Sequence, residues 1–233
     1  MVAPRLVGVR EHMDEPGVDP AELHRTLEDL ARVNHTFGGT RAVLRHLDGL
    51  CRDRRTPLRL LDVGTGYADI PRAIVRWGRD RGLIVEIAAL EPHPVIRGLA
   101  DRACADYPEV HLQDGNGLAL PFPDGGVDIA FASQVLHHME GDEPVRFLAE
   151  LYRVARCGVV VSDLRRGAWP YLLTRATLHA LSRSRLIRHD GPMSIRRGFT
   201  PHELLNLAKA AGWEAPRLHR HPFFRLVIVG RKS

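Results

Sequence analysis

Cysteine and lysine are scarce in this chain of 233 residues, which has three cysteines and only Lys209 and Lys232 as lysines. Cys51, Cys104 and Cys157 lie far apart with no CxxC pair, so we expect neither a disulfide framework nor a metal site. No apolar run approaches the roughly 20 residues that cross a bilayer. Acidic residues occupy the N-terminal stretch where a secretory signal has its hydrophobic segment, so we expect a cytoplasmic protein.

Positive charge is concentrated in one segment. The net charge is +5, yet residues 153–197 hold ten arginines against only Asp163 and Asp190, so the rest of the chain is net acidic. Two interpretations are open: a covering helix with its arginines in solvent, or a basic surface for an anionic acceptor, an acyl-carrier protein, RNA or a membrane. Aromatic residues that stack on bases are scarce there, mainly Trp169 and Tyr171, which disfavours nucleic acid.

Hydrophobic periodicity predicts an alternation of strands and helices. Leucines at helical spacing predict two helices within residues 21–50. Short apolar runs predict buried strands at 58–63, 83–90, 110–112, 127–132 and 158–162, with helices at 69–77, 95–105 and 145–154 between them. Helices at 169–186 and 200–211 and a hairpin at 217–229 follow. We therefore expect an α/β fold: a Rossmann-like, seven-stranded, mostly parallel sheet with helices on both faces.

The helices outside this alternation suggest how the chain is organised. We expect an N-terminal helical cap at 1–52 and a Rossmann-like domain at 53–233, with a helical insertion at about 164–199 after the fifth strand. The cap and the insertion would form a lid over the carboxyl ends of the strands, where parallel sheets bind their ligands.

The first strand ends in the glycine-rich turn Asp62-Val63-Gly64-Thr65-Gly66. Asp69 stands at the third glycine of a G-x-G-x-x-G pattern, where its charge would repel a dinucleotide pyrophosphate, although it would cap a helix in a simple tight turn. S-adenosylmethionine has a positively charged ammonium and sulfonium and no phosphate, so a carboxylate such as that of Asp62 would attract it. Glu91, at the end of the second strand, can accept hydrogen bonds from the ribose hydroxyls of either cofactor.

A third stretch of the chain adds a family resemblance. Residues 115–124, 127–133 and 136–139 follow in close order. With the glycine turn they resemble the class I S-adenosylmethionine-dependent methyltransferases, especially the branch with the ubiquinone- and menaquinone-biosynthesis enzymes, over roughly residues 58–163. The resemblance implies S-adenosylmethionine as cofactor, bound by these residues: Asp62, Gly64, Thr65, Gly66, Glu91, Pro92, Asn116, Gly117, Ser133 and Gln134.

Two positions depart from the family pattern. Ala68 stands where the family often has a third glycine, and we expect this small change to leave the pocket open. Asn116 stands where the family usually has an aspartate that accepts a hydrogen bond from the adenine amino group. An amide oxygen can accept the same bond, and Asp114 is a rival for this role.

The flanks resemble a bacterial subgroup that often accompanies polyketide or flavin-dependent oxygenase genes in natural-product clusters. The matching segments are residues 30–34 with Gly38-Gly39, residues 163–166 and residues 188–200. This resemblance implies an aromatic or polyketide-derived acceptor.

Methyl transfer is an in-line displacement, so the enzyme mainly aligns acceptor and methyl group. A phenol acceptor also benefits from a base, for which the candidates are His137, His138, His189 and Asp190. Each has a structural alternative: the first pair packs against the sheet or caps a turn. The second precedes Gly191, which would end a helix in a left-handed conformation.

The leading hypothesis is a small-molecule methyltransferase, with O-methylation first and C-methylation close behind. The alternatives are an RNA- or protein-directed methyltransferase, a non-catalytic S-adenosylmethionine-binding protein and an NAD-dependent oxidoreductase. A homodimer is compatible with the sequence.

Overall fold

The computed structural model describes residues 3–9, 11–14, 17–50, 57–182 and 184–232. Cys51, Arg183 and the expected domain boundary between residues 52 and 53 lie outside the described residues. Among the described helices, none is long and apolar enough to span a membrane.

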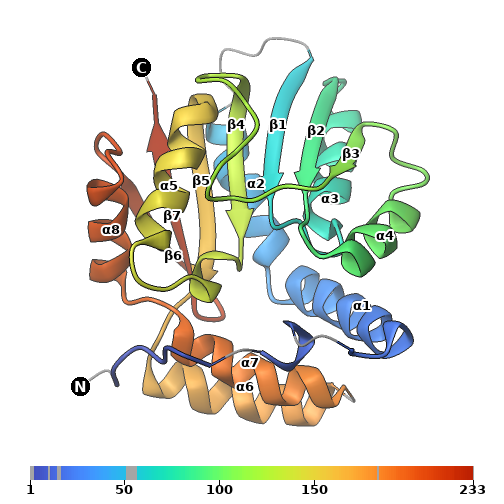
Figure 1. Cartoon of the computed structure of the whole chain (residues 1–233), viewed down its shortest axis with the longest axis vertical. Helices are drawn as coiled ribbons and strands as arrows, with labels where there is room; N and C mark the ends of the chain where they lie inside the picture. Colours follow the sequence, from blue (N-terminus) through green and yellow to red (C-terminus); the bar gives the residue numbers. More distant parts are fainter. Residues whose placement is uncertain (1–2, 10, 15–16, 51–56, 183, 233) are drawn as a thin grey trace.

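A seven-stranded sheet runs through the centre of the molecule in the order β3-β2-β1-β4-β5-β7-β6 (Figure 1). The strands are β1 (Leu58–Val63), β2 (Val85–Leu90), β3 (Val110–Gln113), β4 (Val127–Ser133), β5 (Ala155–Leu164), β6 (Arg217–His221) and β7 (Arg225–Arg231). The first five are parallel, and β7 is antiparallel to both β5 and β6. The predicted mostly parallel sheet is confirmed. The chain order reverses between β1 and β4, which is the topological switch point where such sheets bind ligands.

Helices cover both faces of the sheet. They are α1 (Pro20–Thr36), α2 (Gly39–Leu50), α3 (Asp69–Arg79), α4 (Pro94–Ala103), α5 (Glu143–Val154), α6 (Ala168–Leu181), α7 (Arg185–Arg197) and α8 (Pro201–Ala210), with the short 3-10 turns η1 (His12–Asp14) and η2 (Leu136–His138). Residues of α2, α3 and α4 share a hydrophobic cluster with one face of the sheet, and α5 and α8 share a second cluster with the other.

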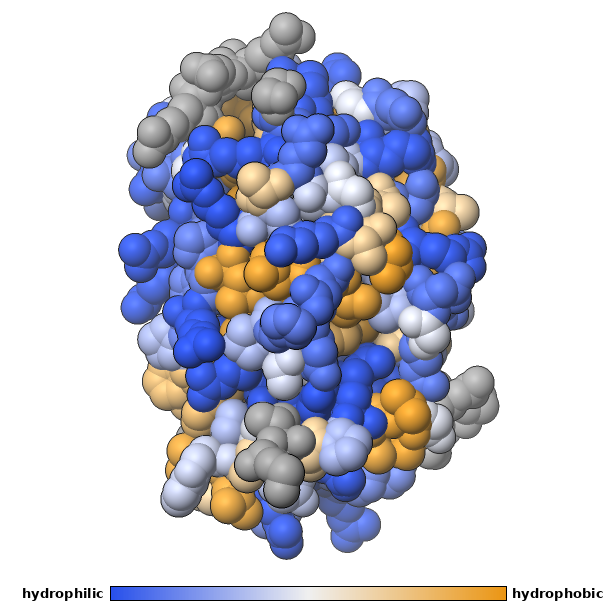
Figure 2. Space-filling model, turned by 90° about the vertical axis from the view of Figure 1, so that its left-hand side faces the viewer, coloured by the Kyte–Doolittle hydropathy of each residue, from blue (hydrophilic) through white to orange (hydrophobic). Residues whose placement is uncertain are grey.

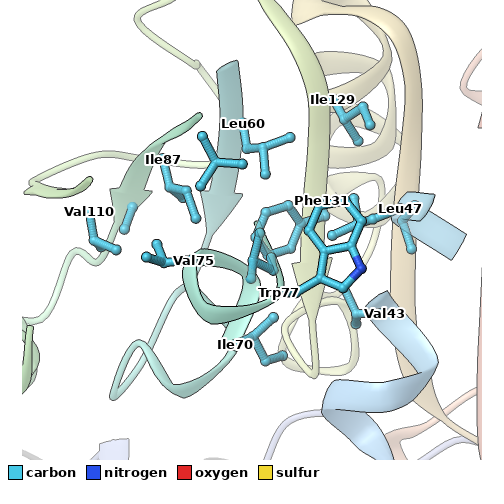
Figure 3. Close-up of a cluster of buried hydrophobic side chains, with 14 of the residues drawn as sticks. Val43, Leu47, Leu60, Ile70, Val75, Trp77, Ile87, Val110, Ile129 and Phe131 are labelled. Atoms are coloured by element: carbon cyan, nitrogen blue, oxygen red, sulfur yellow. The ribbon is translucent and has the colours of Figure 1, made fainter. Parts of the chain in front are cut away.

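The alternation of side chains along β1 explains this layering. Leu58 and Leu60 point into the α2–α3 cluster, whereas Leu61 and Val63 point into the α5–α8 cluster. Figure 3 shows the first cluster, in which Trp77 of α3 lies beside Val43 of α2. Each fully buried aliphatic or aromatic side chain contributes about 1.5–3 kcal/mol relative to exposure, so the two clusters hold the strand ends in place.

The edge strand β6 carries a polar sequence, Arg217-Leu218-His219-Arg220-His221. Charged and polar side chains on an edge strand disfavour pairing with another chain. Figure 2 shows the side of the molecule on which α8 and β6 lie, where hydrophilic residues surround a smaller apolar area.

The N-terminal segment, α1, α6 and α7 lie across the carboxyl ends of the parallel strands (Figure 1). Leu23 and Leu27 of α1 pack against Ile96 and Leu99 of α4. Helix α7 contacts η1, η2 and α1, while α6 packs on α7. Trp169 of α6 is 73% exposed. The covering element nearest the strand ends is thus α7 rather than α6.

The expectation of one long helix over residues 169–186 is wrong. Helix α6 ends at Leu181, and α7 begins after Ser184, whose hydroxyl accepts a hydrogen bond from the Ile187 amide. The expected helix end at Gly191 is wrong too, because Gly191 lies inside α7. A Cβ there would lie 2.2 Å from Leu178 of α6, so glycine allows the two helices to pack closely.

Candidate functional site

The turn after β1 requires glycine. The amides of Gly64 and Thr65 both donate to the Leu90 carbonyl at 2.9 Å, which ties the turn to the end of β2. Gly64 has φ +73°, and a Cβ on it would lie 2.5 Å from a methyl group of Val135. Gly66 has φ +55° with open space beside its Cα. The first glycine therefore meets both a backbone and a packing requirement, the second only a backbone requirement.

Ala68 occupies the left-handed conformation that explains why the family often has glycine here. Its φ is +53°, a conformation that disfavours L-residues by roughly 1–2 kcal/mol. Its methyl group is fully buried in the core. Ala68 is also the N-cap of α3, so the structure does not show the alternative of a simple tight turn capped by Asp69. The Asp69 carboxylate instead accepts a hydrogen bond from the Asn34 amide at 3.2 Å.

Glu91 is held rigidly at the end of β2. One carboxylate oxygen accepts from the Gly66 amide at 2.9 Å and the other from the His93 amide at 3.0 Å. The residue is buried. A carboxylate oxygen can accept more than one hydrogen bond, so an acid held at this edge can serve as an acceptor for hydroxyl groups. Pro92, the next residue, is exposed.

Asp62 lies among other carboxylates. Its pKa is raised to about 8, mainly by burial; Thr65 opposes this rise, and the nearby charges of Asp69 and Glu91 add to it. A cation placed beside these three acids would be attracted to them, while a phosphate would be repelled.

Asn116 and Gly117 lie in the loop after β3. The Asn116 side-chain oxygen accepts from the Leu118 amide at 2.9 Å, leaving one lone pair for another donor. Asp114 is exposed and pairs with Arg97 at 3.4 Å. Gly117 leaves no room for a Cβ, which would lie 2.4 Å from a phenylalanine ring of α5.

Ser133 and Gln134 close the end of β4. Gln134 has φ +60°, its amide donates to the Ser162 carbonyl at 2.8 Å, and its side-chain amide donates to Asn34 at 3.1 Å. The Ser133 hydroxyl is buried without a hydrogen-bond partner among the described residues. Cap helix α1 is thus bonded to the strand ends through Asn34.

His137 is buried between two carboxylates. Its Nδ1 lies 2.9 Å from Asp163, and its Nε2 lies 3.5 Å from Glu11. Burial alone would lower the pKa of His137, but the two carboxylates outweigh it and raise the pKa to about 9. A protonated imidazole offers no lone pair to a proton or a metal ion.

His138 differs from its neighbour in exposure. Its side chain is 32% exposed, and its Nε2 lies 4.0 Å from the second oxygen of Glu11. Glu11 also accepts a hydrogen bond from the Ser194 hydroxyl at 2.6 Å. Burial raises the pKa of Glu11, yet the two histidines and Ser194 lower it to about 2. The N-terminal segment therefore supplies a carboxylate to the histidine pair.

His189 and Asp190 hold the N-terminal segment on α7. The Asp190 carboxylate accepts from the amides of His12 and Met13 at 3.0 and 3.1 Å. It also accepts from His189 at 2.8 Å, and the rings of His12 and His189 stack at 3.8 Å. In the structure this pair joins the N-terminal segment to α7. Both belong to the covering layer, by which we mean the N-terminal segment, α1, α6 and α7, which lie across the strand ends.

Several arginines of the arginine-rich segment bond to other parts of the molecule. Arg166 is buried and bonds to the Ala3 and Gly198 carbonyls and to Glu203. Arg197 is buried and donates to the carbonyls of Val9, His137 and His138. Arg153 and Arg156 pair with carboxylates of Asp124, Glu150 and Asp128. These contacts account for much of the local charge without an anionic partner.

Sequence reasoning missed Glu11 and Arg225, which are both buried in polar clusters. Glu11 lies in a segment without hydrophobic periodicity, so nothing local distinguished it from a solvated acid. Asn34 and Asp163 were present in the flanking segments that resemble the bacterial subgroup, although their roles were not predicted.

The chain resembles known proteins in sequence and in fold. Residues 61–162 match the family model of a methyltransferase domain. A demethylmenaquinone methyltransferase of Thermus thermophilus is 33% identical over 108 residues, which are 45% of this chain and 45% of that protein. A Mycolicibacterium smegmatis protein described as a probable S-adenosylmethionine-dependent methyltransferase is 27% identical over 152 residues, 62% of this chain and 51% of that one. The chain thus spans about half the length of the curated relatives it matches.

The fold has a close structural counterpart. A S-adenosylmethionine-dependent methyltransferase from Aquifex aeolicus superposes with a TM-score of 0.66 at 18% identity, covering 91% of this chain and 97% of that one. The shared fold includes the sheet whose switch point carries Gly64 and Glu91.

Proposed function

We propose that this chain, a class I S-adenosylmethionine-dependent methyltransferase by its domain and fold, transfers a methyl group to a small-molecule acceptor. The observation that carries the proposal is Glu91, whose two oxygens are fixed by the Gly66 and His93 amides at the switch point of the sheet. A carboxylate that two backbone amides hold at this edge of the sheet suits the hydroxyl donors of a ribose.

The surrounding residues fit S-adenosylmethionine better than a dinucleotide. Asp62 and Asp69 favour positive charge, and Asp69 lies at the first position of α3, where a dinucleotide would place its pyrophosphate. Gly64, Thr65 and Gly66 would bring the backbone to the cofactor, Asn116 and Gly117 would border the adenine, and Ser133 and Gln134 the methionine end. The cofactor supplies the methyl group on a sulfonium that is already activated for displacement.

The acceptor would enter beneath the covering layer, which we propose acts as a lid. Its parts are joined by buried polar contacts, among them Glu11 with Ser194 and Asp190 with the amides of His12 and Met13. A covered site suits a small molecule better than RNA or a protein chain. The relative from Thermus thermophilus is named for a small acceptor, demethylmenaquinone. We propose an aromatic or polyketide-derived acceptor, methylated at a hydroxyl or a ring carbon.

We assign the residue roles from protonation and exposure. His137 would position the loop after β4, because both of its nitrogens face carboxylates. His138 is the proposed base, since its side chain is partly exposed next to the Glu11 carboxylate. His189 and Asp190 would hold the N-terminal segment closed over the site.

Incubation with methyl-labelled cofactor tests the proposal. Label should move to members of a panel of phenols and polyphenols, and not to total RNA or protein from a cell extract. The His138→Asn variant should retain cofactor binding but lose rate with phenols, while an exposed control, His202→Asn on α8, should match the parent protein. Label transferred only to RNA or protein would overturn the small-molecule assignment.

A further inference from the structure

Arg225 is a buried cation with two unused donors. It begins β7, is 5% exposed, and donates from Nη2 to the Asn34 side-chain oxygen at 3.0 Å. Its Nε and Nη1 have no hydrogen-bond partner in the described part of the chain. Burial lowers the pKa of Arg225 to about 10, so the group remains charged at neutral pH. A buried guanidinium with two unbonded nitrogens is destabilising, which calls for a functional explanation.

The donors around Arg225 point to one kind of ligand. Gln134 donates to the same Asn34 oxygen at 3.1 Å, so its amide and the guanidinium lie within about 6 Å of each other. The hydroxyls of Ser133 and Ser162 are also buried without partners among the described residues. Ser133 of β4 pairs in register with Ser162 of β5, and Arg225 of β7 pairs with Leu164, which is two residues after Ser162. Because side chains alternate between the two faces of a sheet, those of Ser133, Ser162 and Arg225 lie on the same face.

The carboxylates nearest to this cluster are already engaged. Asp69 accepts a hydrogen bond from the side-chain nitrogen of Asn34 at 3.2 Å. Asp163 faces His137 at 2.9 Å. Both carboxylates raise the pKa of Arg225 through their charge, against the larger effect of burial, but neither accepts a hydrogen bond from its Nε or Nη1.

The backbone around Arg225 is built to hold it. A Cβ on Gly39 would lie 2.1 Å from the Asn34 oxygen and 2.8 Å from Arg225 Nη2, so only glycine fits. The hairpin tip before Arg225 places Phe223 and Phe224 at φ +56° and +60°, where Asn and Gly are usual. Phe223 packs edge-on against Phe37 beyond α1, with ring centroids 4.9 Å apart.

We infer that Arg225, with Gln134, Ser133 and Ser162, forms a carboxylate-binding subsite where the carboxyl ends of β4 and β5 meet the start of β7. The inference rests on the proposed function and extends it. An N–H group of the guanidinium can donate a charge-assisted hydrogen bond to a carboxylate oxygen, and the serine hydroxyls can donate to the same group. Two sources have this chemistry: the amino-acid end of the cofactor and an acidic acceptor.

Calorimetry with two cofactor fragments separates these sources. S-adenosylhomocysteine carries the carboxylate, whereas 5′-methylthioadenosine shares the nucleoside and the sulfur but lacks the amino-acid end. If the cofactor is the source, Arg225→Met should weaken S-adenosylhomocysteine by about 10- to 100-fold and leave methylthioadenosine unchanged. If the acceptor is the source, both ligands should bind as before, and the KM for hydroxybenzoates should rise while that for their methyl esters does not.

Two controls separate a loss of ligand binding from a loss of folding. Arg231→Met changes an exposed arginine of the same strand and should alter neither ligand. Because Arg225→Met replaces a buried charge with an apolar side chain, its Tm should be unchanged or higher, whereas a purely structural arginine would lower it. Unchanged affinity for S-adenosylhomocysteine and unchanged KM for the acids in folded Arg225→Met would overturn the subsite. Failure of the parent protein to bind either adenosine ligand would instead overturn the proposed function, and the subsite with it.

Discussion

His137 and Asp163 form a buried pair in which the Nδ1 atom of the imidazole lies 2.9 Å from the carboxylate. The Asp163 carboxylate also accepts from the His137 backbone amide at 3.2 Å. Because Glu11 faces the other ring nitrogen, the pair connects β5 and η2 to the N-terminal segment. We therefore expect the stability of this connection to depend on the protonation of His137.

Stability should fall at alkaline pH because of His137. Its pKa is raised from 6.5 to about 9, so its stabilising contribution is complete below pH 6.5 and is lost as the pH rises through 9. The loss should be on the order of 2–3 kcal/mol. Urea unfolding between pH 6 and 10 measures it. His137→Asn should show a flatter profile over this range, and equal slopes in the two proteins would contradict the assignment.

The same cluster predicts that the protein also loses stability at acid pH. The pKa of Glu11 is lowered from 4.5 to about 2, so its contribution is present above pH 4.5 and is lost as the pH falls through 2. Glu11→Gln should therefore remove part of the fall in unfolding free energy below pH 4.5. Ser194→Ala, which deletes one neutral donor to Glu11, should keep most of that fall.

Asp190 should hold the N-terminal segment against local opening. Asp190→Ala removes the acceptor of the His12 and Met13 amides, at about 1 kcal/mol per hydrogen bond. Limited proteolysis should then cut within residues 3–14 faster by about tenfold, while the global unfolding transition changes less. His189→Ala leaves these two amide bonds in place and should be cut more slowly than Asp190→Ala. Equal cutting of all three proteins would contradict this role.

The glycine turn should tolerate a methyl group only if Val135 is shortened. In Gly64→Ala the new Cβ would meet a Val135 methyl at 2.5 Å, and the backbone at φ +73° would be strained as well. Affinity for S-adenosylhomocysteine should fall at least about tenfold. The double variant with Val135→Ala should recover part of that loss, because the clash is relieved and only backbone strain remains. No recovery would show that strain alone determines the effect.

Cofactor binding should release a proton from Asp62. Burial and neighbouring acids raise its pKa to about 8, so it is mostly protonated at pH 7, and a bound cation favours the ionised form. Calorimetry at pH 7 in buffers of different ionisation enthalpy measures the released proton. Asp62→Asn should abolish the release, and a release that persists in this variant would assign the proton elsewhere.

The sequence predicted the parts of the site that follow from local pattern. Apolar runs located β1, β2 and β4, and parallel strands bring Asp62, Glu91 and Ser133 to one edge because their carboxyl ends meet there. The resemblance added roles for these residues. The acidic and glycine positions could therefore be named before the geometry was known.

The remaining contacts join segments far apart in the chain. Glu11 meets Ser194, and Arg225 meets Asn34, across 183 and 191 residues, which no periodicity encodes. The break between α6 and α7 was missed because its serines resemble ordinary helix-surface residues until one of them caps α7. Gly191 was interpreted as a helix end, whereas close packing against Leu178 explains it.

The central claim is that the switch point of the sheet, with Glu91 at its centre, binds S-adenosylmethionine. The most direct test is calorimetric titration of the parent protein and Glu91→Ala with S-adenosylhomocysteine and with NAD. We predict one-to-one binding of S-adenosylhomocysteine to the parent protein, affinity at least about tenfold weaker in Glu91→Ala, and no tight binding of NAD. Tighter binding of NAD, or affinity for S-adenosylhomocysteine that does not change in Glu91→Ala, would contradict the claim.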